Sequence, residues 1–372
     1  MILSAKRFKT AVLFQNGSIG DFLMAVFLAE MLQKSGHVAH LTIVVPRNVT
    51  FLRGLLGAYP HISAVEVSRR SGCGQLLKMA RNTNLVVVHP TLGKISLPTK
   101  ILGWLISRSH GSEFLGFQDS GPLSKILYSK TLVYNTDQLY SENIQNIARA
   151  LGAPVLVQVP DLKITLDFKP LQACGLDQGR YIVFHPGASA RERAFTIRTA
   201  QEVIEHVLKR NPGMHVVLSG SSAEGKWIEE IRNGIQNQER IVNAIGCSAQ
   251  AIAAFIQSAQ CFIGTDTGIT HLACFLGAPV IVAAHHGTAN WLPFYCPSAT
   301  VLYRLAEEEA VHQSREYLDA QRRGRIKPFG TVPSHAICAV LDRFVGCHGS
   351  EAESAQKLAF EENGNSPYDF RQ

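Results

Sequence analysis

Three polar residues, Asp266, Thr267 and His271, stand close together in an otherwise apolar stretch of the chain. The pattern predicts a short strand at Cys261–Ile263, a turn at Gly264–Gly268, and a short helix from about Ile269 to Leu276 that Gly277 stops. Thr267 and His271 are four residues apart and therefore share one helix face. A turn of this kind at the carboxyl end of a strand is typical of sites that bind anions. The alternative is that Asp266 or Thr267 caps the helix and that His271 is an ordinary core side chain.

A second carboxylate, that of Asp21, follows a glycine turn after the apolar stretch Thr10–Gln15. The turn Gly17–Gly20 lacks the third glycine of the dinucleotide-binding fingerprint, because Phe22 and Leu23 stand in its place. As a helix N-cap, Asp21 would contribute about 1 kcal/mol to stability. As a carboxylate at the mouth of the first strand, it is able to accept a proton. Both interpretations of Asp21 remain open at this point.

Two arginines, Arg191 and Arg193, follow a glycine turn after the apolar stretch Tyr181–His185. Guanidinium groups together with backbone N–H groups suit a diphosphate. The alternative is a solvated loop with no ligand.

Strands and helices alternate regularly in both halves of the 372-residue chain. The expected elements include a helix near 75–82 and strands at Glu113–Phe117, Tyr181–His185 and Val280–Ala284. This alternation predicts an α/β fold with parallel sheets and right-handed crossovers. The length and a proline-containing stretch at residues 152–180 favour two domains, which we place at 1–170 and 171–347. The polar tail, 348–372, is expected to be disordered. With two successive doubly wound halves, the expected active site is a cleft between similar domains.

The charged residues are divided unevenly along the chain. Residues 1–170 hold 18 Lys and Arg against 9 Asp and Glu, a net charge of +9, whereas residues 171–372 hold 18 against 20, a net of −2. A basic first half indicates an anionic partner there, such as a lipid headgroup, an acidic saccharide or nucleic acid. A generally basic, solvated surface would give the same imbalance.

Several other classes of protein are disfavoured by the sequence. The eight cysteines are scattered without a C-x-x-C pair, which favours buried reduced thiols over a zinc site or a disulfide framework. No run of 18 apolar residues predicts a membrane span, and the first residues do not resemble a signal peptide. An Asp-x-Asp pair, which would suggest a metal-bound diphosphate, does not occur in the sequence.

Taken together, the motifs resemble glycosyltransferase family nine, the family of ADP-heptose:lipopolysaccharide heptosyltransferases. The resemblance extends from about Thr10 to Pro293 in the family's order and spacing. It is carried by Gly17–Asp21, His185–Ser189, Gly220–Glu224, Asp266–His271, Gly287–Thr288 and Trp291–Pro293. It implies a GT-B fold, in which two Rossmann-like doubly wound domains face each other across a cleft. The N-terminal domain would bind the acceptor and the C-terminal domain the nucleotide-sugar donor, with inverting transfer and neither a metal nor another cofactor.

Carried over residue by residue, the resemblance makes Asp21 the general base and Glu224 the carboxylate near the donor nucleoside. Either Arg193 or its rival Arg191 would hold the diphosphate. The expected donor-binding residues are Ser189, Arg191, Arg193, Glu224, Asp266, Thr267, Gly268 and His271; the expected acceptor-binding residues are Gly17, Ser18, Gly20, Lys94 and Lys100. The chain departs from the family pattern at Ala284–Thr288 and in the segment 305–330, which we interpret as an insertion or an exposed helix.

The resemblance implies ADP-heptose as the donor and an anionic lipopolysaccharide-core-type glycolipid as the acceptor. The protein is then expected in the cytoplasm, with possible peripheral contact with the inner membrane and no nucleic-acid partner. Two alternatives stay open. One is an NADP-dependent oxidoreductase, in which Arg47 would contact a 2′-phosphate and which Phe22 and Leu23 disfavour. The other is a binding protein that keeps the GT-B fold without catalysis.

Overall fold

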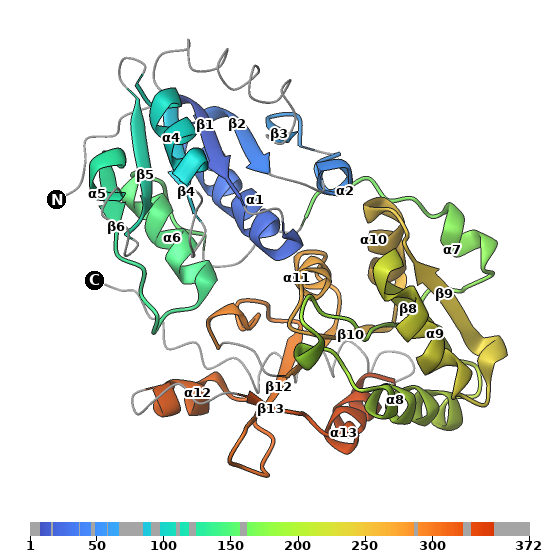
Figure 1. Ribbon diagram of the computed structural model, residues 1–372. Coiled ribbons are helices and arrows are strands. Elements are labelled where there is room, and N and C mark those ends of the chain that lie inside the picture. The colour runs from blue at the N-terminus through green and yellow to red at the C-terminus, as the bar shows by residue number, and fades with distance from the viewer. Residues whose placement is uncertain are drawn as a thin grey trace. The chain divides into compact units, whose positions relative to one another are not determined.

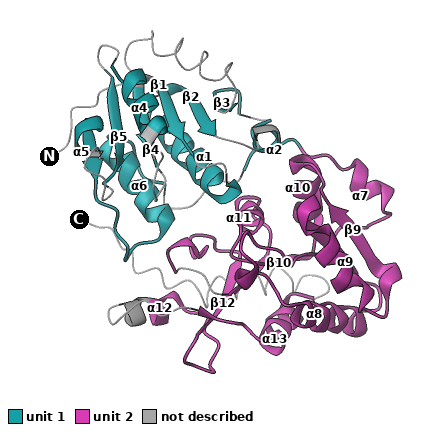
Figure 2. Ribbon diagram, viewed as in Figure 1, with its two compact units in different colours: residues 1–165 teal, residues 166–372 magenta. Residues whose placement is uncertain are grey.

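The computed structural model divides the chain into two compact units, residues 1–165 and residues 166–372 (Figure 2). It describes residues 8–15, 18–36, 38–45, 49–57, 59–66, 85–90, 97–108, 112–118, 124–156, 162–285, 289–322 and 329–345. Several predictions lie outside these residues, namely those for Gly17, Arg47, the helix near 75–82, Lys94, Gly287, Thr288 and the tail 348–372.

Unit 1 contains a parallel sheet with the strand order β3-β2-β1-β4-β5-β6 among the described residues (Figure 1). Its strands are β1 (Phe8–Phe14), β2 (Val38–Val45), β3 (Ile62–Glu66), β4 (Leu85–His89), β5 (Glu113–Phe117) and β6 (Lys130–Leu132). Its helices are α1 (Ile19–Lys34), α2 (Val49–Gly54), α4 (Leu97–Ile106), α5 (Ser124–Leu127) and α6 (Tyr140–Ala150). The strand order reverses between β1 and β4, and ligands of open α/β sheets bind at such a switch point.

The helix α1 is buried along most of its length, as its apolar sequence predicts. It packs against β2 and α6. Its one acidic residue beyond the first turn, Glu30, is only 3% exposed and lies 3.4 Å from Nε2 of His61. The burial of α1 fixes its first turn at the carboxyl end of β1, where Asp21 lies.

Unit 2 repeats the strand order of unit 1 and adds one antiparallel strand at its edge. Its order is β13-β12-β11-β10-β7-β8-β9 among the described residues. The strands are β7 (Tyr181–His185), β8 (His215–Gly220), β9 (Ile241–Ile245), β10 (Cys261–Thr265), β11 (Val280–Ala284), β12 (Ala299–Leu305) and β13 (Phe329–Gly330). The switch point of this sheet lies between β7 and β10.

The helices of unit 2 are α7 (Lys169–Ala173), α8 (Ile197–Arg210), α9 (Gly225–Asn233), α10 (Ala249–Ser258), α11 (Gly268–Phe275), α12 (Arg315–Arg322) and α13 (Ser334–Val345). Each of α8 to α11 follows a parallel strand, as right-handed crossovers require, whereas α7 precedes β7 and α13 follows the antiparallel β13. The described residues of unit 2 also form the 3-10 turns η1 (Arg191–Arg193), η2 (Ser222–Glu224), η3 (Gln238–Arg240) and η4 (Ala289–Trp291).

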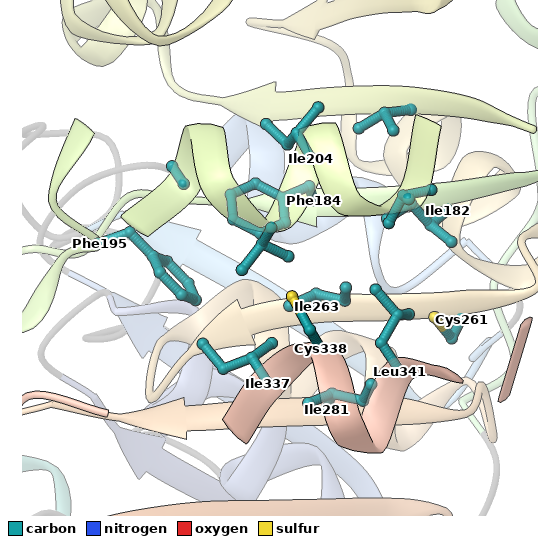
Figure 3. Packing of buried hydrophobic residues seen from close by; sticks show 14 of the residues in the cluster. Ile182, Phe184, Phe195, Ile204, Cys261, Ile263, Ile281, Ile337, Cys338 and Leu341 are labelled. Carbon is teal, nitrogen blue, oxygen red and sulfur yellow. The ribbon is translucent and has the colours of Figure 1, made fainter. Parts of the chain in front are cut away.

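Side chains from α8 and α13 pack on the central strands of unit 2 (Figure 3). Ile204 of α8 and Leu341 of α13 belong to the same buried cluster as Ile182, Ile263 and Ile281 of β7, β10 and β11. Full burial of each such side chain contributes about 1.5–3 kcal/mol. The cluster therefore holds the three strands firmly in register, and with them the loops at their carboxyl ends.

The segment 305–330 is more closely integrated than the sequence indicates. It contains the predicted exposed helix, α12, but it then returns to the sheet at β13, where Phe329 is only 2% exposed. Glu308 accepts hydrogen bonds from the Tyr317 hydroxyl at 2.5 Å and from the His312 ring at 2.9 Å.

The prediction of buried thiols is confirmed for Cys261, Cys274, Cys296 and Cys338, which are free and buried, but not for Cys174, which is exposed, or Cys247, which is partly exposed. Burial raises the pKa of the Cys261 thiol to about 12, so this thiol stays protonated and unreactive near neutral pH. Within the described part of the chain, no helix has both the length and the hydropathy that crossing a bilayer requires.

Candidate functional site

The expected donor-binding residues lie in the segments that directly follow three neighbouring strands of unit 2. Ser189, Arg191 and Arg193 follow β7, Glu224 follows β8, and Asp266–His271 follow β10. In the sheet, β7 pairs with both β8 and β10, and all three strands are parallel. Their carboxyl ends therefore meet at one edge of the sheet, at its switch point. The fold thus brings together residues that are up to 82 positions apart in the chain, from Ser189 to His271.

The carboxylate of Glu224 is held over the glycine loop that follows β7. Its Oε2 accepts the Ser221 N–H at 2.8 Å and the Ser221 hydroxyl at 2.6 Å. A Cβ atom added to Gly187 would lie 1.9 Å from Oε1 of Glu224, which is far closer than real side chains approach. Residue 187 must therefore be glycine for the carboxylate to occupy this position. The sequence shows the glycine but not its neighbour, because that contact joins two different loops.

Two buried threonines connect the loop after β7 with the turn after β10. The Thr265 hydroxyl donates to the Gly187 carbonyl oxygen at 3.1 Å, and the Thr270 hydroxyl donates to the Thr265 carbonyl oxygen at 2.5 Å. Both threonine side chains are fully buried. Buried hydrogen bonds of this kind hold backbone segments in one arrangement. The sequence analysis did not single out Thr265 or Thr270, although both lie inside or next to a recognised motif.

The side chains of Asp266, His271 and Tyr295 form a buried cluster, with the His271 ring between the other two. Nε2 of His271 lies 3.5 Å from Oδ1 of Asp266, and its Nδ1 lies 2.6 Å from the Tyr295 hydroxyl. Burial, with smaller contributions from two nearby thiols and from Asp266, raises the pKa of Tyr295 well above its usual value. Tyr295 therefore keeps its proton near neutral pH, and the His271 ring lies between the Tyr295 hydroxyl and the Asp266 carboxylate.

This geometry bears on the alternative in which Asp266 or Thr267 caps the helix and His271 is a core side chain. The N-cap of α11 is Thr267, so the capping interpretation of Asp266 is wrong. His271 is a buried histidine with satisfied ring nitrogens, as expected for a core side chain, but one of its partners is the Asp266 carboxylate. Tyr295 was missed because nothing in the sequence near residue 295 indicates which ring it stacks on.

The first turn of α11 is not capped by the side chain of its N-cap residue. Thr267 makes no side-chain bond to the helix backbone; its hydroxyl instead lies 3.2 Å from that of Thr270. The helix begins at Gly268, which has no side chain to cover the turn. N–H groups at a helix start attract anions when no side chain caps them. This end of α11 is suited to a negatively charged group.

The two arginines differ in their surroundings. Arg193 is partly buried and its guanidinium donates to the Ser189 hydroxyl, whereas Arg191 is exposed. The loop that carries them is closed by a hydrogen bond of 3.0 Å from the Phe195 N–H to the Pro186 carbonyl oxygen. Phe195 is 2% exposed and anchors the loop in the core of unit 2. The Arg193 guanidinium is therefore held by a contact within its own loop.

His185, at the end of β7, lies beneath these loops. It is 6% exposed, and its Nδ1 lies 3.1 Å from the Ser219 hydroxyl. Burial lowers the pKa of His185, and the charge of Glu224 opposes this effect in part. A neutral, buried imidazole in this place supports the loop and presents no exposed base.

In unit 1, Asp21 lies in the first turn of α1 and is 4% exposed. The N-cap of α1 is Ser18, so the interpretation of Asp21 as the N-cap is wrong. The Ser18 hydroxyl donates to Oδ2 of Asp21 at 2.5 Å, and the Asp21 N–H donates to the Ser18 oxygen at 3.2 Å. The amino end of a 16-residue helix also favours the charged carboxylate. Asp21 is thus a fixed carboxylate at the end of β1.

Tyr140 is a neighbour of Asp21 that the sequence analysis missed. Its hydroxyl donates to the carbonyl oxygen of Pro90, which directly follows β4, at 2.9 Å. Its pKa is raised well above the usual value, first by burial and then by the charge of Asp21. Asp21 and Pro90 follow β1 and β4, the two strands of the switch point in unit 1. No pattern in the sequence links Tyr140 with Asp21, because they begin two different helices.

The expected acceptor-binding residues are not all at the surface. Ser18 is exposed, whereas Gly20 is buried within α1. Lys100 is 7% exposed and shares the inward side of α4 with Gly103 and Ile106, which are also buried. Lys100 therefore does not form an exposed cation, because the three-residue spacing turns it towards the sheet. Gly17 and Lys94 are outside the described residues.

No group of three or more His, Cys, Asp or Glu side chains suited to a metal ion occurs in the described parts of the chain.

Comparison with known proteins gives one matching family. The family model described as glycosyltransferase family 9 (heptosyltransferase) matches residues 102–315 of this chain, more than half of its length. No curated protein sequence matches the chain.

Solved structures share the fold at low sequence identity. A glycosyl transferase family 9 protein from Veillonella parvula superposes with a TM-score of 0.68 at 18% identity, over 91% of this chain and 98% of that one. The ADP-heptose lps heptosyltransferase II of E. coli gives the same values. The E. coli heptosyltransferase WaaC, solved with ADP, has a TM-score of 0.60 at 16% identity, over 78% of this chain and 92% of that one. The two Rossmann-like units thus have the GT-B type of fold.

Proposed function

The chain belongs to glycosyltransferase family 9, the heptosyltransferase family, and on this premise we propose that it transfers heptose from ADP-heptose to an anionic lipopolysaccharide-core-type acceptor. Membership makes the protein a glycosyltransferase, so neither the oxidoreductase nor the non-catalytic alternative is retained. The proposed transfer inverts the anomeric centre and needs no metal. Unit 2 binds the donor and unit 1 binds the acceptor.

The observation that carries this proposal is the edge of the sheet in unit 2, where a fixed carboxylate stands beside groups that suit a diphosphate. Glu224 accepts two hydrogen bonds from Ser221 and keeps lone pairs that can accept from ribose hydroxyls. Arg193 and the start of α11 supply positive charge at the ends of the adjacent strands. A nucleoside diphosphate has its hydroxyls and its charge in this same order.

Asp266 and His271 have a supporting part in the proposed donor site. Their contact, with Tyr295 on the other side of the ring, fixes the turn that begins α11. A fixed turn keeps the N–H groups of Gly268 and its successors directed at the diphosphate before the reaction begins. Such preorganised groups stabilise charge in the transition state without rearrangement.

In the proposed reaction, the Asp21 carboxylate takes the proton from an acceptor hydroxyl. The acceptor oxygen forms a bond to the anomeric carbon of heptose, and the bond from that carbon to the diphosphate oxygen breaks. The electron pair of the broken bond leaves with ADP, whose added negative charge Arg193 and the α11 start stabilise. Removing one such charge-stabilising donor from an enzyme commonly costs about 2.7–4 kcal/mol of the barrier.

The basic character of unit 1 suits the proposed acceptor. Residues 1–165 carry 17 Lys and Arg against 8 Asp and Glu, a net charge of +9. Phosphates and acidic sugars of a lipopolysaccharide core would be attracted to such a surface. The acceptor would be reached at the cytoplasmic face of the inner membrane, and the proposal includes no nucleic acid.

A thermal-shift comparison of nucleotides tests the donor assignment. We expect ADP and ADP-heptose to raise the melting temperature, and UDP, GDP and NADP to have little effect. At a ligand concentration of 100 times Kd the stabilisation is about 2.7 kcal/mol, which corresponds to a shift of roughly 5–10 °C for a domain of this size. Equal shifts with all nucleotides, or a shift with NADP alone, would contradict the assignment.

A matched pair of variants locates the binding site in the same assay. Glu224→Gln keeps an oxygen that can accept from Ser221, so the fold should persist while the ADP shift becomes smaller. Glu230→Gln makes the same change at an exposed position of α9 and should leave the shift unaltered. If both variants respond to ADP like the wild type, Glu224 is not part of the nucleotide site.

A further inference from the structure

The outer side of α4 in unit 1 is apolar although it lies at the surface. Apart from Thr99 and Lys100, the sequence of this helix is apolar or glycine. On its inner side, Ile106 belongs to a buried cluster that also contains Phe114 of β5 and Tyr128, which lies between α5 and β6. Ile101 and Leu105 share the outer side and are 40% and 47% exposed. A helix with apolar side chains on its outer as well as its inner side is usually covered by protein or in contact with lipid.

Two neighbouring elements of unit 1 also expose apolar side chains. The helix α5 contacts α4 and carries Ile126, which is 72% exposed. Val133, directly after β6, is 77% exposed. The helix α5 lies beside β6, the edge strand of the sheet in unit 1 (Figure 1). We define Ile101, Leu105, Ile126 and Val133 as the apolar patch.

The concentration of these side chains sets them apart from ordinary surface hydrophobics. Among the described residues, five large apolar side chains are classed as exposed, and four of them form the apolar patch. The fifth, Phe168, is in unit 2. Single exposed apolar residues are normal, but a group of them marks a surface that meets a protein or a membrane.

Charge distinguishes between these two partners. Arg108 lies in the turn that directly follows α4 and is exposed, and its guanidinium carbon lies 5.2 Å from the ring centre of Trp104. Lys130 of β6 is partly exposed and donates to the Ala150 carbonyl oxygen. Tryptophan and arginine beside exposed aliphatic side chains are typical of elements that lie in the membrane interface. The net charge of +9 on residues 1–165 complements anionic headgroups.

We propose that the apolar patch docks unit 1 on a membrane surface that contains anionic phospholipid headgroups. Ile101 and Leu105 enter the boundary between headgroups and acyl chains, and Arg108 stays at the level of the phosphates. This inference rests on the proposed function, since a glycolipid acceptor is itself held in such a surface. Docking through unit 1 would keep the acceptor-binding unit beside its substrate during repeated reactions.

Sedimentation of the full-length protein with vesicles tests the docking without any donor. Vesicles of phosphatidylcholine alone are compared with vesicles that also contain phosphatidylglycerol. We expect the wild type to bind the anionic vesicles and the double variant Ile101→Ser/Leu105→Ser to bind them about tenfold more weakly or worse. Ile126→Ser, on a different helix, should weaken binding in the same direction. Arg108→Glu should weaken binding and reduce its dependence on salt.

Matched controls lie outside the patch. Phe168→Ser removes the remaining exposed apolar side chain and should leave vesicle binding unchanged. Lys209→Glu reverses an exposed charge on α8 and should have much less effect than Arg108→Glu. Wild-type transfer by the double variant to a lipid-free core saccharide would show that the site is intact, so loss of docking and failure of the proposed transfer are separately visible.

Three results would overturn the proposal. The first is binding of anionic vesicles by the double variant with the affinity of the wild type. The second is equal weakening by Phe168→Ser. The third is a wild-type dimer that ignores vesicles and becomes a monomer in the double variant on analytical ultracentrifugation, which would make the patch an interface between two copies of the chain.

Discussion

Replacing Asp21 by Asn is expected to lower kcat by about 10²–10⁴-fold, because an amide cannot take the proton from the acceptor hydroxyl. Asn keeps the size of the side chain and an oxygen that can accept from Ser18. Only the favourable interaction of the charge with the amino end of α1 is lost, about 0.3–1 kcal/mol of stability. Steady-state kinetics with saturating donor, together with a thermal melt, measure both effects.

The control for this variant is Asp137→Asn, the same change at an exposed position of unit 1. It should transfer heptose at the wild-type rate. Donor affinity should be almost the same in both variants, since unit 2 binds the nucleotide. If Asp21→Asn transfers at nearly the wild-type rate, Asp21 is a structural carboxylate and the base lies elsewhere. A fall in kcat that only follows a large loss of melting temperature would equally deny Asp21 a role in proton transfer.

Arg193→Ala is expected to lower kcat by about 10²–10³-fold, because one stabilising charge on the departing diphosphate is lost. Arg191→Ala makes the same change two residues away and should have a much smaller effect. The structure motivates this difference, since Arg193 is partly buried and bonded to Ser189 whereas Arg191 is exposed. Single-turnover measurements with saturating ADP-heptose separate the chemical step from donor binding.

The opposite order of the two arginine variants would assign the diphosphate to Arg191. Equal and small effects would mean that the start of α11 carries the charge of the leaving group almost alone. Neither variant should change the melting temperature by more than a few degrees, because both side chains lie in the 3-10 turn η1 at the surface of unit 2. A large loss of stability would show that the loop, and not the diphosphate, depends on the arginine.

The order of the main elements could be predicted from the sequence because local patterns determine it. The strands Tyr181–His185 and Val280–Ala284 were predicted with their observed bounds, and the strand at Glu113–Phe117 likewise. Strongly apolar runs bounded by glycine or proline leave little choice of structure. The bounds at the turn after β10 were less accurate, since β10 continues to Thr265 and α11 already begins at Gly268. The strand β12 and the helix α13 were not recognised.

The contacts of the site could be predicted only in part, because they join segments that are distant in the chain. The alternation of strands and helices places Asp266 and Glu224 at the same edge of a sheet. It does not show that Glu224 lies over Gly187 or that Tyr295 stacks on His271. The identity of an N-cap is another local detail that the sequence leaves open, since both Ser18 and Asp21 are good capping residues. The proximity of Tyr140 to Asp21 depends on the packing of α6 against α1, which the sequence does not show.

The most direct test of the proposed activity is transfer of heptose from ADP-heptose to a lipopolysaccharide-core acceptor in the presence of excess EDTA. Mass spectrometry of the acceptor and measurement of released ADP follow the two products together. We expect one heptose per acceptor and one ADP per heptose, at the same rate with and without the chelator, because arginine and the start of α11 hold the diphosphate. Failure to transfer from ADP-heptose, or transfer that stops with EDTA and returns with Mg²⁺ or Mn²⁺, would contradict the proposed metal-independent transfer.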